Sequence, residues 1–299
     1  MTSSDAAVPT ARRFLQVDVF GSGPFRGNPL AVVVDADGLT DEQMQRIASW
    51  TNLSETTFLL SPTRPEADYR VRIFTPSSEL DFAGHPTLGS AFAWLRSQAD
   101  GASARTLVQE CPAGLVEVRA GGDGLAFAAP PLVRSGPLEA DHVDAAARAL
   151  GIEPDQVLDH AWVDNGAGWC VLELASAQDV LALEPDLAAI PGRKIGALGV
   201  VGSTDDGSQP AYEVRGFVAP DPTAGTAGYE DPVTGSLNAG IAQWMIERGR
   251  LSPPWTARQG TRVGRDGLVL IDSAVDAEGQ EALWIGGTVR IGITGEVLV

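Results

Sequence analysis

The chain has 299 residues, of which 39 are acidic and 21 are basic, so its formal net charge is −18. This length suffices for a sizeable core and two domains. A negative field of this size repels phosphate groups, so it disfavours nucleic acid and anionic membranes as partners without excluding an anionic substrate. No apolar run is long enough for a signal peptide or a membrane span, so we expect a cytoplasmic protein.

The first elements of the chain are expected to be a strand hairpin and a helix. Residues 16–20 and 29–35 are apolar segments on either side of the turn-forming sequence GSGPFRGN. This pattern is typical of two antiparallel strands. The segment 40–50 predicts a helix, because Thr40 and Gln43 have the spacing of a capping box.

A strand and the helix that follows it occur twice in the sequence. YRVRIF at 69–74 has a counterpart in YEVRGF at 212–217, and each precedes a loop and a helix that begins at a glycine, Gly84 or Gly235. Two matches in the same order indicate two related parts of the chain. Each helix is expected to bury one side, since apolar residues recur at helical spacing: Leu88, Ala91, Phe92 and Leu95 in the first, and Leu237, Ile241, Trp244 and Met245 in the second.

The other segments fit the same plan more loosely. HAWVDNG and WCVLEL predict a second hairpin, and residues 177–190 predict an irregular helix interrupted by a proline. The proline-rich segment 129–141 marks the expected boundary between an N-terminal half, 12–130, and a C-terminal half, 131–299. Two further strands are expected to complete the second sheet or to cross back to the first, 282–291 and 295–299.

We therefore expect an α+β fold of two similar, pseudo-symmetric halves with a cleft between them. The two helices that begin at glycines would aim their N-termini into this cleft, where free backbone N–H groups bind anions. A small carboxylate-bearing substrate would be held there. Asn28, in the first hairpin, either reaches the same cleft or is an ordinary turn residue. The candidate substrate-binding residues are Asn28, Gly84, Thr234, Gly235 and Ser236.

Three ionisable residues are candidates for acid–base chemistry. Glu55 lies between a predicted helix and an apolar strand, where a solvated turn residue is the alternative interpretation. Asp231 lies just before the second glycine-led helix, where a helix cap is the alternative. His85 follows the first glycine, and a helix N-terminus favours its neutral imidazole, which can donate and accept a proton. Its alternative role is a hydrogen bond to its own loop.

Neither a metal nor a cofactor is expected. The three histidines and the two cysteines, Cys111 and Cys170, show no metal-ligand spacing, and both thiols are expected to be buried and free. GSGPFRG at 21–27 is similar to a dinucleotide-binding loop. However, Arg26 stands where the third glycine is required, and a strand rather than a helix follows.

Four motifs carry a resemblance to a known family. In chain order they are GNPLAVV, NLSETTF, LDFAGHPTLGSA and EDPVTGS, and together they resemble the PhzF, or phenazine biosynthesis-like, family over almost the whole chain. The resemblance implies the fold of diaminopimelate epimerase. In that fold each half is a mostly antiparallel sheet wrapped around a central helix, with the active site in the cleft between the halves. It also implies a homodimer that needs no cofactor.

The resemblance further implies roles for individual residues. Glu55 would be the acid–base residue that moves a proton along a conjugated ring. His85 and Asp231 would bind and orient the substrate and assist the transfer, and Gly235 and Ser236 would bind its carboxylate. Two residues after this serine depart from the family pattern and leave the exact substrate open: Leu237 and Asn238.

The leading hypothesis is a cofactor-independent isomerase, with a role in secondary metabolism. Glu55 would remove a proton from a small unsaturated cyclic amino or imino acid and return it at another carbon. A second hypothesis is an epimerase that acts at one carbon with Glu55 and Asp231 on opposite faces. A two-thiol racemase is disfavoured, because neither cysteine lies in the motifs. A third hypothesis is a non-catalytic small-molecule binding protein, for which a placed base has little use.

Overall fold

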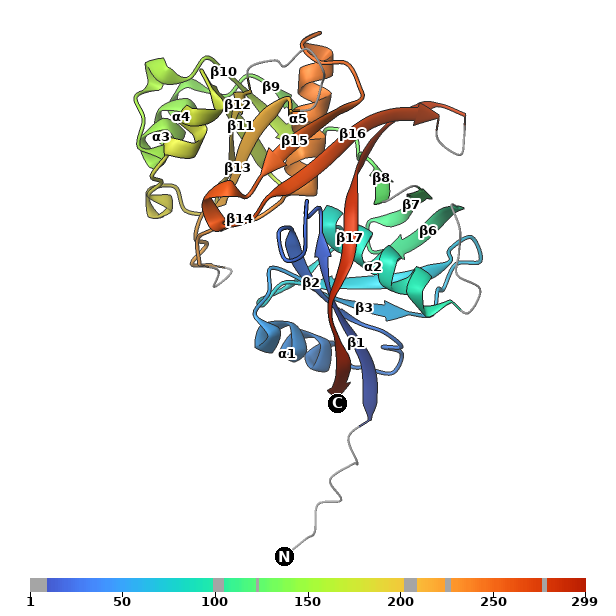
Figure 1. Ribbon diagram of the computed structural model, residues 1–299. Coiled ribbons are helices and arrows are strands. Elements are labelled where there is room, and N and C mark those ends of the chain that lie inside the picture. The colour runs from blue at the N-terminus through green and yellow to red at the C-terminus, as the bar shows by residue number, and fades with distance from the viewer. Residues whose placement is uncertain (1–9, 99–104, 122–123, 202–208, 224–226, 276–278) are drawn as a thin grey trace, which may run out of the picture.

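Strands make up most of the fold, and helices pack against them. The computed structural model describes residues 10–98, 105–121, 124–201, 209–223, 227–275 and 279–299 (Figure 1). The α-helices in these ranges are α1 (Asp41–Thr51), α2 (Gly84–Ser97), α3 (Ala140–Leu150), α4 (Ala177–Ala182) and α5 (Gly235–Glu247). The protein is therefore of the mixed α+β class, as expected.

Eight strands pair into a closed barrel, which lies in the lower part of Figure 1. The pairs β2–β3 and β4–β6 are parallel and the other pairs are antiparallel. A short strand, β5 (Glu79–Leu80), adds to β4. In order around the barrel, and closing back on the first, the strands are β1 (Ala11–Val19), β2 (Asn28–Val33), β3 (Thr56–Leu60), β4 (Tyr69–Phe74), β6 (Arg105–Cys111), β7 (Gly114–Gly121), β8 (Gly124–Ala128) and β17 (Glu281–Leu298).

Helix α2 contacts all eight strands of this barrel. Residues 84–91, its first two turns, are buried on every side. The apolar spacing predicted burial of one side only, and this prediction was wrong because the strands that surround the helix come from distant parts of the chain. A Cβ atom on Gly89 would lie 2.5 Å from Leu30 Cδ2 and 2.9 Å from Val17 Cγ2. Only glycine lets the helix approach the strands this closely.

A second series of strands repeats the order of pairings of the first. The pairs β10–β11, β11–β12, β12–β13, β13–β15 and β15–β16 have the same directions as β1–β2, β2–β3, β3–β4, β4–β6 and β6–β7. Both predicted hairpins are present. The strands are β9 (Arg134–Gly136), β10 (Asp159–Asp164), β11 (Trp169–Leu174), β12 (Lys194–Val200), β13 (Tyr212–Val218), β14 (Tyr229–Asp231), β15 (Trp255–Gln259) and β16 (Gly267–Val275).

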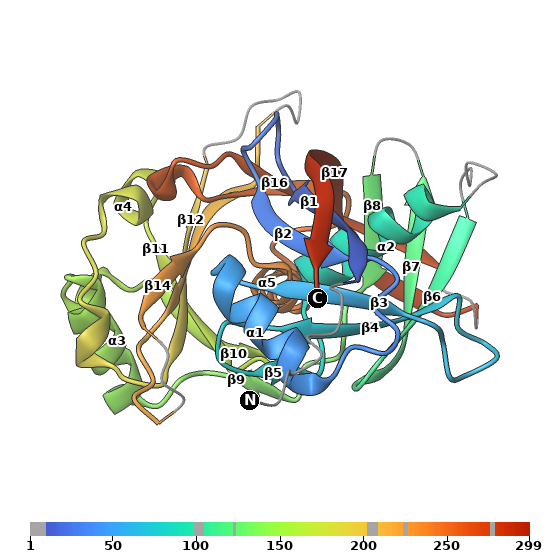
Figure 2. The same cartoon turned by 90° about the horizontal axis from the view of Figure 1, so that it is seen from below.

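The helices take equivalent places in the two series. Helix α1 connects β2 to β3, and α4 connects β11 to β12; α2 follows β5, and α5 follows β14. Helix α5 contacts β10, β11, β16 and β17. Figure 2 shows the second sheet beside the barrel, with α3 and α4 on its outer side.

Strand β17 joins the two sheets. It pairs with β16 through residues 281–286, with β8 through 284–288 and with β1 through 289–298. Two separate strands were predicted here, so this prediction was wrong. The register of β1 shifts between Gln16 and Val17, opposite Gly292. Gly292 is therefore accommodated as a β-bulge inside one continuous strand.

Local sequence signals predict their elements well. In α1, Thr40 Oγ1 accepts a hydrogen bond from the backbone N–H of Gln43 at 3.2 Å, and Gln43 Oε1 accepts one from the N–H of Thr40 at 2.9 Å. This confirms the capping box. The irregular helix predicted over 177–190 is α4, followed by a 3₁₀ turn at Leu187–Ala189.

Three further observations bear on the function classes. Cys111 and Cys170 are buried, free thiols. Among the described residues, no helix combines the length and the hydropathy needed to cross a bilayer. In the same part of the chain, His, Cys, Asp and Glu side chains do not gather in the groups of three that a metal ion would need.

Candidate active site

The N-termini of α2 and α5 meet near the centre of the molecule (Figure 1). A Cβ atom on Gly84 would lie 3.1 Å from Gly235 Cα and 2.8 Å from Phe127 Cζ, and one on Gly235 would lie 3.2 Å from Gly84 Cα. The two glycines therefore allow the helix starts to touch. The first backbone N–H groups of each helix have no acceptor within the helix and carry the positive end of its dipole. This junction is suited to an anion.

Glu55 and His85 face each other beside this junction. Glu55 lies just before β3, and His85 is the second residue of α2. Glu55 Oε2 is 3.3 Å from His85 Nε2, and the side chains are 12% and 5% exposed. Neither atom has a hydrogen bond of good geometry to any other described atom. Buried polar groups without partners are costly, so both are available to a ligand.

Burial raises the pKa of Glu55 to about 8. The nearby charge of Asp231 contributes to this rise, and the charge of Lys194 opposes it. A pKa near the working pH is what a residue needs in order to take up and return a proton. The alternative interpretation of Glu55 as a solvated turn residue is therefore wrong, because its carboxyl group is withdrawn from water.

His85 is held as a neutral imidazole. Burial lowers its pKa to about 3, so desolvation, rather than the expected helix dipole, is the main cause. Asn28 Nδ2 lies 3.3 Å from Nδ1 of the ring and 3.0 Å from both Asp231 Oδ1 and Val233 O. Two of these neighbours are oxygen acceptors, so the amide nitrogen must face them. An amide nitrogen cannot accept a hydrogen bond, so Nδ1 is the unprotonated ring nitrogen, and the ring proton is assigned to Nε2, facing Glu55.

Both carboxylate oxygens of Asp231 accept hydrogen bonds. Its Oδ1 accepts from Asn28 Nδ2 at 3.0 Å, and its Oδ2 accepts from Thr234 Oγ1 at 2.7 Å. Burial raises its pKa to about 6, and these two hydrogen bonds oppose that rise. No side chain caps the N-terminus of α5, so the alternative of a capping aspartate is wrong. Asp231 instead orients Asn28, which in turn faces His85.

Ser236 and Thr234, both predicted to bind substrate, differ in their free hydrogen-bonding capacity. The Thr234 hydroxyl donates to Asp231 and accepts from Gln259 Nε2 at 2.9 Å. Ser236 Oγ accepts from Trp169 Nε1 at 3.0 Å. An indole N–H can only donate, so the hydroxyl hydrogen of Ser236 remains free to donate to a ligand. The hydroxyl of Thr234 has instead a structural role.

Sequence reasoning did not identify Gln259 as part of this site. Its Oε1 accepts from the Thr234 N–H and from Asn238 Nδ2, each at 2.9 Å, and its Nε2 donates to Thr234 Oγ1 and to the Asp231 carbonyl. Gln259 and Asn238 are both fully buried. The available signal was a glutamine on the inward-facing positions of β15, where alternation places an apolar residue.

Lys194, at the start of β12, was also missed. Its charge acts on both Glu55 and Asp231. Burial lowers its pKa, and the charges of Glu55, Asp164 and Asp231 oppose this effect. It is the only lysine in the sequence. The presence of a single lysine was a sequence signal that could have identified Lys194 as a candidate site residue.

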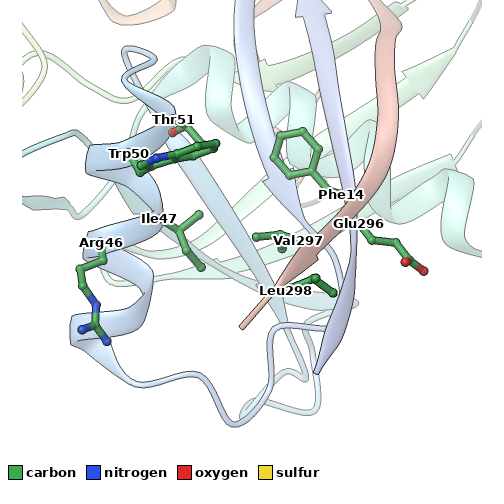
Figure 3. A pocket seen from close by; sticks show the side chains of 8 residues that line it. All are labelled: Phe14, Arg46, Ile47, Trp50, Thr51, Glu296, Val297 and Leu298. Carbon is green, nitrogen blue, oxygen red and sulfur yellow. The ribbon is translucent and has the colours of Figure 1, made fainter. Parts of the chain in front are cut away.

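Two cavities of the described structure lie away from these residues. The larger, about 690 Å³, is a mostly apolar groove between α1 and the end of β17, and Figure 3 shows Trp50 and Phe14 at its upper edge. The smaller, about 210 Å³, lies against the outside of β1 and includes Asp18 and Gly27. Glu55, His85 and Asp231 line neither cavity. The candidate site is therefore identified by its buried unpaired polar atoms, Glu55 Oε2 and His85 Nε2.

The chain matches the profile of the family described as phenazine biosynthesis-like protein, PhzC-PhzF, over residues 17–295. Antisense-enhancing sequence 1 of Schizosaccharomyces pombe is 36% identical over 97% of this chain and 100% of its own length. An isomerase of Pasteurella multocida is 32% identical over 95% of this chain and 93% of its own. The trans-2,3-dihydro-3-hydroxyanthranilate isomerase of Pseudomonas aeruginosa is 54% identical over 81 residues, which cover 27% of this chain and 29% of its own.

Solved structures agree with this likeness. A PhzF-family phenazine biosynthesis protein of Bacillus anthracis superposes with a TM-score of 0.80 at 25% identity, covering 97% of this chain and 100% of its own. A hydroxyproline epimerase of Agrobacterium vitis has a TM-score of 0.56 at 16% identity, covering 97% of this chain and 93% of its own. The second likeness concerns the fold alone.

Proposed function

This chain belongs to the phenazine biosynthesis-like (PhzC-PhzF) family and is an isomerase, and on that premise we propose that it moves a proton along a small unsaturated cyclic amino or imino acid without a cofactor. Glu55 takes the proton from one carbon and returns it to another. The observation that carries this proposal is the buried carboxyl group of Glu55, 3.3 Å from a neutral imidazole, beside two helix N-termini.

The raised pKa of Glu55 suits both halves of the reaction. A carboxylate with an ordinary pKa is a weak base, whereas one with a pKa of about 8 binds a proton more strongly and still releases it. His85 has its Nε2 proton toward Glu55 and can donate to the carboxylate or to substrate. Asp231 acts through Asn28, which holds the ring in this tautomer. The catalytic residues proposed are thus Glu55 and His85, with Asp231 as their positioning residue.

The substrate carboxylate is proposed to bind at the helix junction. Removing a proton next to an acid group delocalises negative charge into that group. Preorganised donors at this point stabilise the transition state. The free N–H groups at the starts of α2 and α5 and the free hydroxyl hydrogen of Ser236 are such donors.

We also propose that the two series of strand pairings are the pseudo-symmetric halves expected from the sequence, each built around one helix, α2 or α5. The support is the shared order of parallel and antiparallel pairs and the contact of the two helix starts. In this interpretation the active site lies between the halves, and each half contributes one glycine and one side chain at its helix start.

The test is proton exchange with solvent. We expect the wild-type enzyme to incorporate deuterium from heavy water into one member of a panel of cyclic amino acids, such as 3,4-dehydroproline and dihydroanthranilates. Glu55→Gln should lower this rate by about 10²–10⁴-fold, whereas Glu66→Gln, at an exposed glutamate, should leave it unchanged. Equal rates for Glu55→Gln and wild type would refute the assigned role.

The position of the label separates a double-bond shift from epimerisation. Deuterium at a new carbon together with a migrated double bond supports the proposed reaction. Deuterium at the original carbon with inverted configuration indicates an epimerase. The contacts of Asp231 argue against its use as a second base, because both of its carboxylate oxygens already accept hydrogen bonds.

A further inference from the structure

Lys194 occupies the place in the second strand series that Glu55 occupies in the first. The repeated strands align Phe74 of YRVRIF with Phe217 of YEVRGF. Phe74 pairs with Thr56 in β3, and Phe217 pairs with Ile195 in β12. The residues just before these partners are Glu55 and Lys194. The two positions are therefore equivalent by strand register.

Both residues also lie near the start of a helix that begins at a glycine. Glu55 faces His85, the residue after Gly84, and the residue after Gly235 is Ser236. The Lys194 ammonium lies 6.0 Å from the centre of the Trp169 ring, and Trp169 Nε1 donates to Ser236 Oγ at 3.0 Å. The lysine therefore stands near the start of α5 as the glutamate stands near the start of α2.

The ammonium group of Lys194 has no hydrogen bond or ion pair with the described residues, and its side chain is only partly buried. Its positive charge acts on both Glu55 and Asp231. An anionic substrate that approaches two carboxyl groups in a protein of charge −18 needs a local positive charge. Charge-assisted hydrogen bonds to a carboxylate are about twice as strong as neutral ones.

We propose that Lys194, together with Ser236 and the N-terminus of α5, binds the carboxylate of the substrate and makes the site selective for acids over their uncharged analogues. The site is thereby divided: Glu55 and His85 move the proton, and Lys194 and Ser236 hold the acid group. This inference rests on the proposed function, since the anion it places is the substrate's own carboxylate.

The single lysine gives a direct spectroscopic test. Protein grown with [¹³Cε,¹⁵Nζ]-lysine has one lysine side-chain signal, that of Lys194. We expect saturable shifts of this signal on titration with 2-aminobenzoate and none with 2-aminobenzamide, which has the same ring but no charge. A Glu55→Gln sample should respond in the same way. Equal shifts with both probes, or no shift with 2-aminobenzoate up to its solubility limit, would overturn the assignment.

Two variants complete the test by calorimetric binding of the same probes. Lys194→Met keeps the length of the stem and removes the charge, and it should weaken 2-aminobenzoate binding by about tenfold or more while leaving 2-aminobenzamide within about twofold. Lys194→Arg should retain most of the selectivity. A fall in affinity for both probes alike, or for neither, contradicts the proposal.

The two proposals fail in different ways. Loss of the acid-over-amide selectivity in Lys194→Met, together with the expected fall in deuterium exchange in Glu55→Gln, supports both proposals. Unchanged selectivity in Lys194→Met, with a shifted pH profile of exchange, means that the lysine only tunes the pKa of Glu55, and this inference is then wrong while the isomerase proposal stands. Full exchange activity in Glu55→Gln removes the proposed base and leaves the binding result untouched.

Discussion

Burial is the main cause of the unusual protonation of the three ionisable groups at the junction. It raises the pKa of Glu55 to about 8 and that of Asp231 to about 6, and it lowers the pKa of His85 to about 3. Near neutral pH the imidazole is therefore uncharged, and Asp231 is ionised before Glu55. Two carboxyl groups with separated pKa values can take different roles in one site.

The raised pKa of Glu55 also predicts how folding stability depends on pH. The folded protein keeps the Glu55 proton up to about pH 8, whereas the unfolded chain loses it near its ordinary pKa. The contribution of this raised pKa to folding stability is complete below the ordinary pKa of glutamate, and it is lost as the pH rises through 8. We expect Glu55→Gln to gain stability relative to wild type between pH 5 and pH 9, measured by guanidinium unfolding. Parallel stability curves for the two proteins would show that the carboxyl group is not desolvated.

At the scale of elements, the close contact of α2 and α5 depends on two glycines. We expect Gly84→Ala to lower stability by about 1–3 kcal/mol and to slow deuterium exchange, because its Cβ would lie 2.8 Å from Phe127 Cζ and 3.1 Å from Gly235 Cα. Gly295→Ala is the matched control, since a Cβ there meets nothing within 4 Å. Urea unfolding and exchange rates measure both effects. Equal stability of the two variants would mean that the helix starts can separate freely.

Elements coded by local signals were predictable from the sequence, and those that depend on distant partners were not. The capping box of α1 lies within four residues, and its helix was predicted correctly. The continuity of β17 depends on a bulge against β1, almost 280 residues away in the chain, and no local pattern reveals it. The burial of α2 on every side likewise depends on strands from both ends of the chain.

The candidate site was predictable to the extent that its residues lie in motifs. Glu55, His85 and Asp231 stand in three of the four motifs, and the structure brings them together. Lys194 and Gln259 lie outside all four, and their importance follows from strand register and from contacts between distant segments. A single sequence reveals such residues only when every residue of the second strand series is aligned with its counterpart in the first.

For the whole molecule, β17 makes the two strand series depend on each other. The barrel closes only when β17 pairs with both β1 and β8, while the same strand continues the second sheet through β16. A fragment of residues 10–130 therefore lacks one strand of its barrel and leaves two unpaired edges. We expect it to unfold without cooperativity, whereas the same fragment with residues 281–299 attached through a flexible linker should regain a cooperative thermal transition, measured by circular dichroism. A cooperative transition of the shorter fragment would show that the N-terminal half is stable without the strand that it shares.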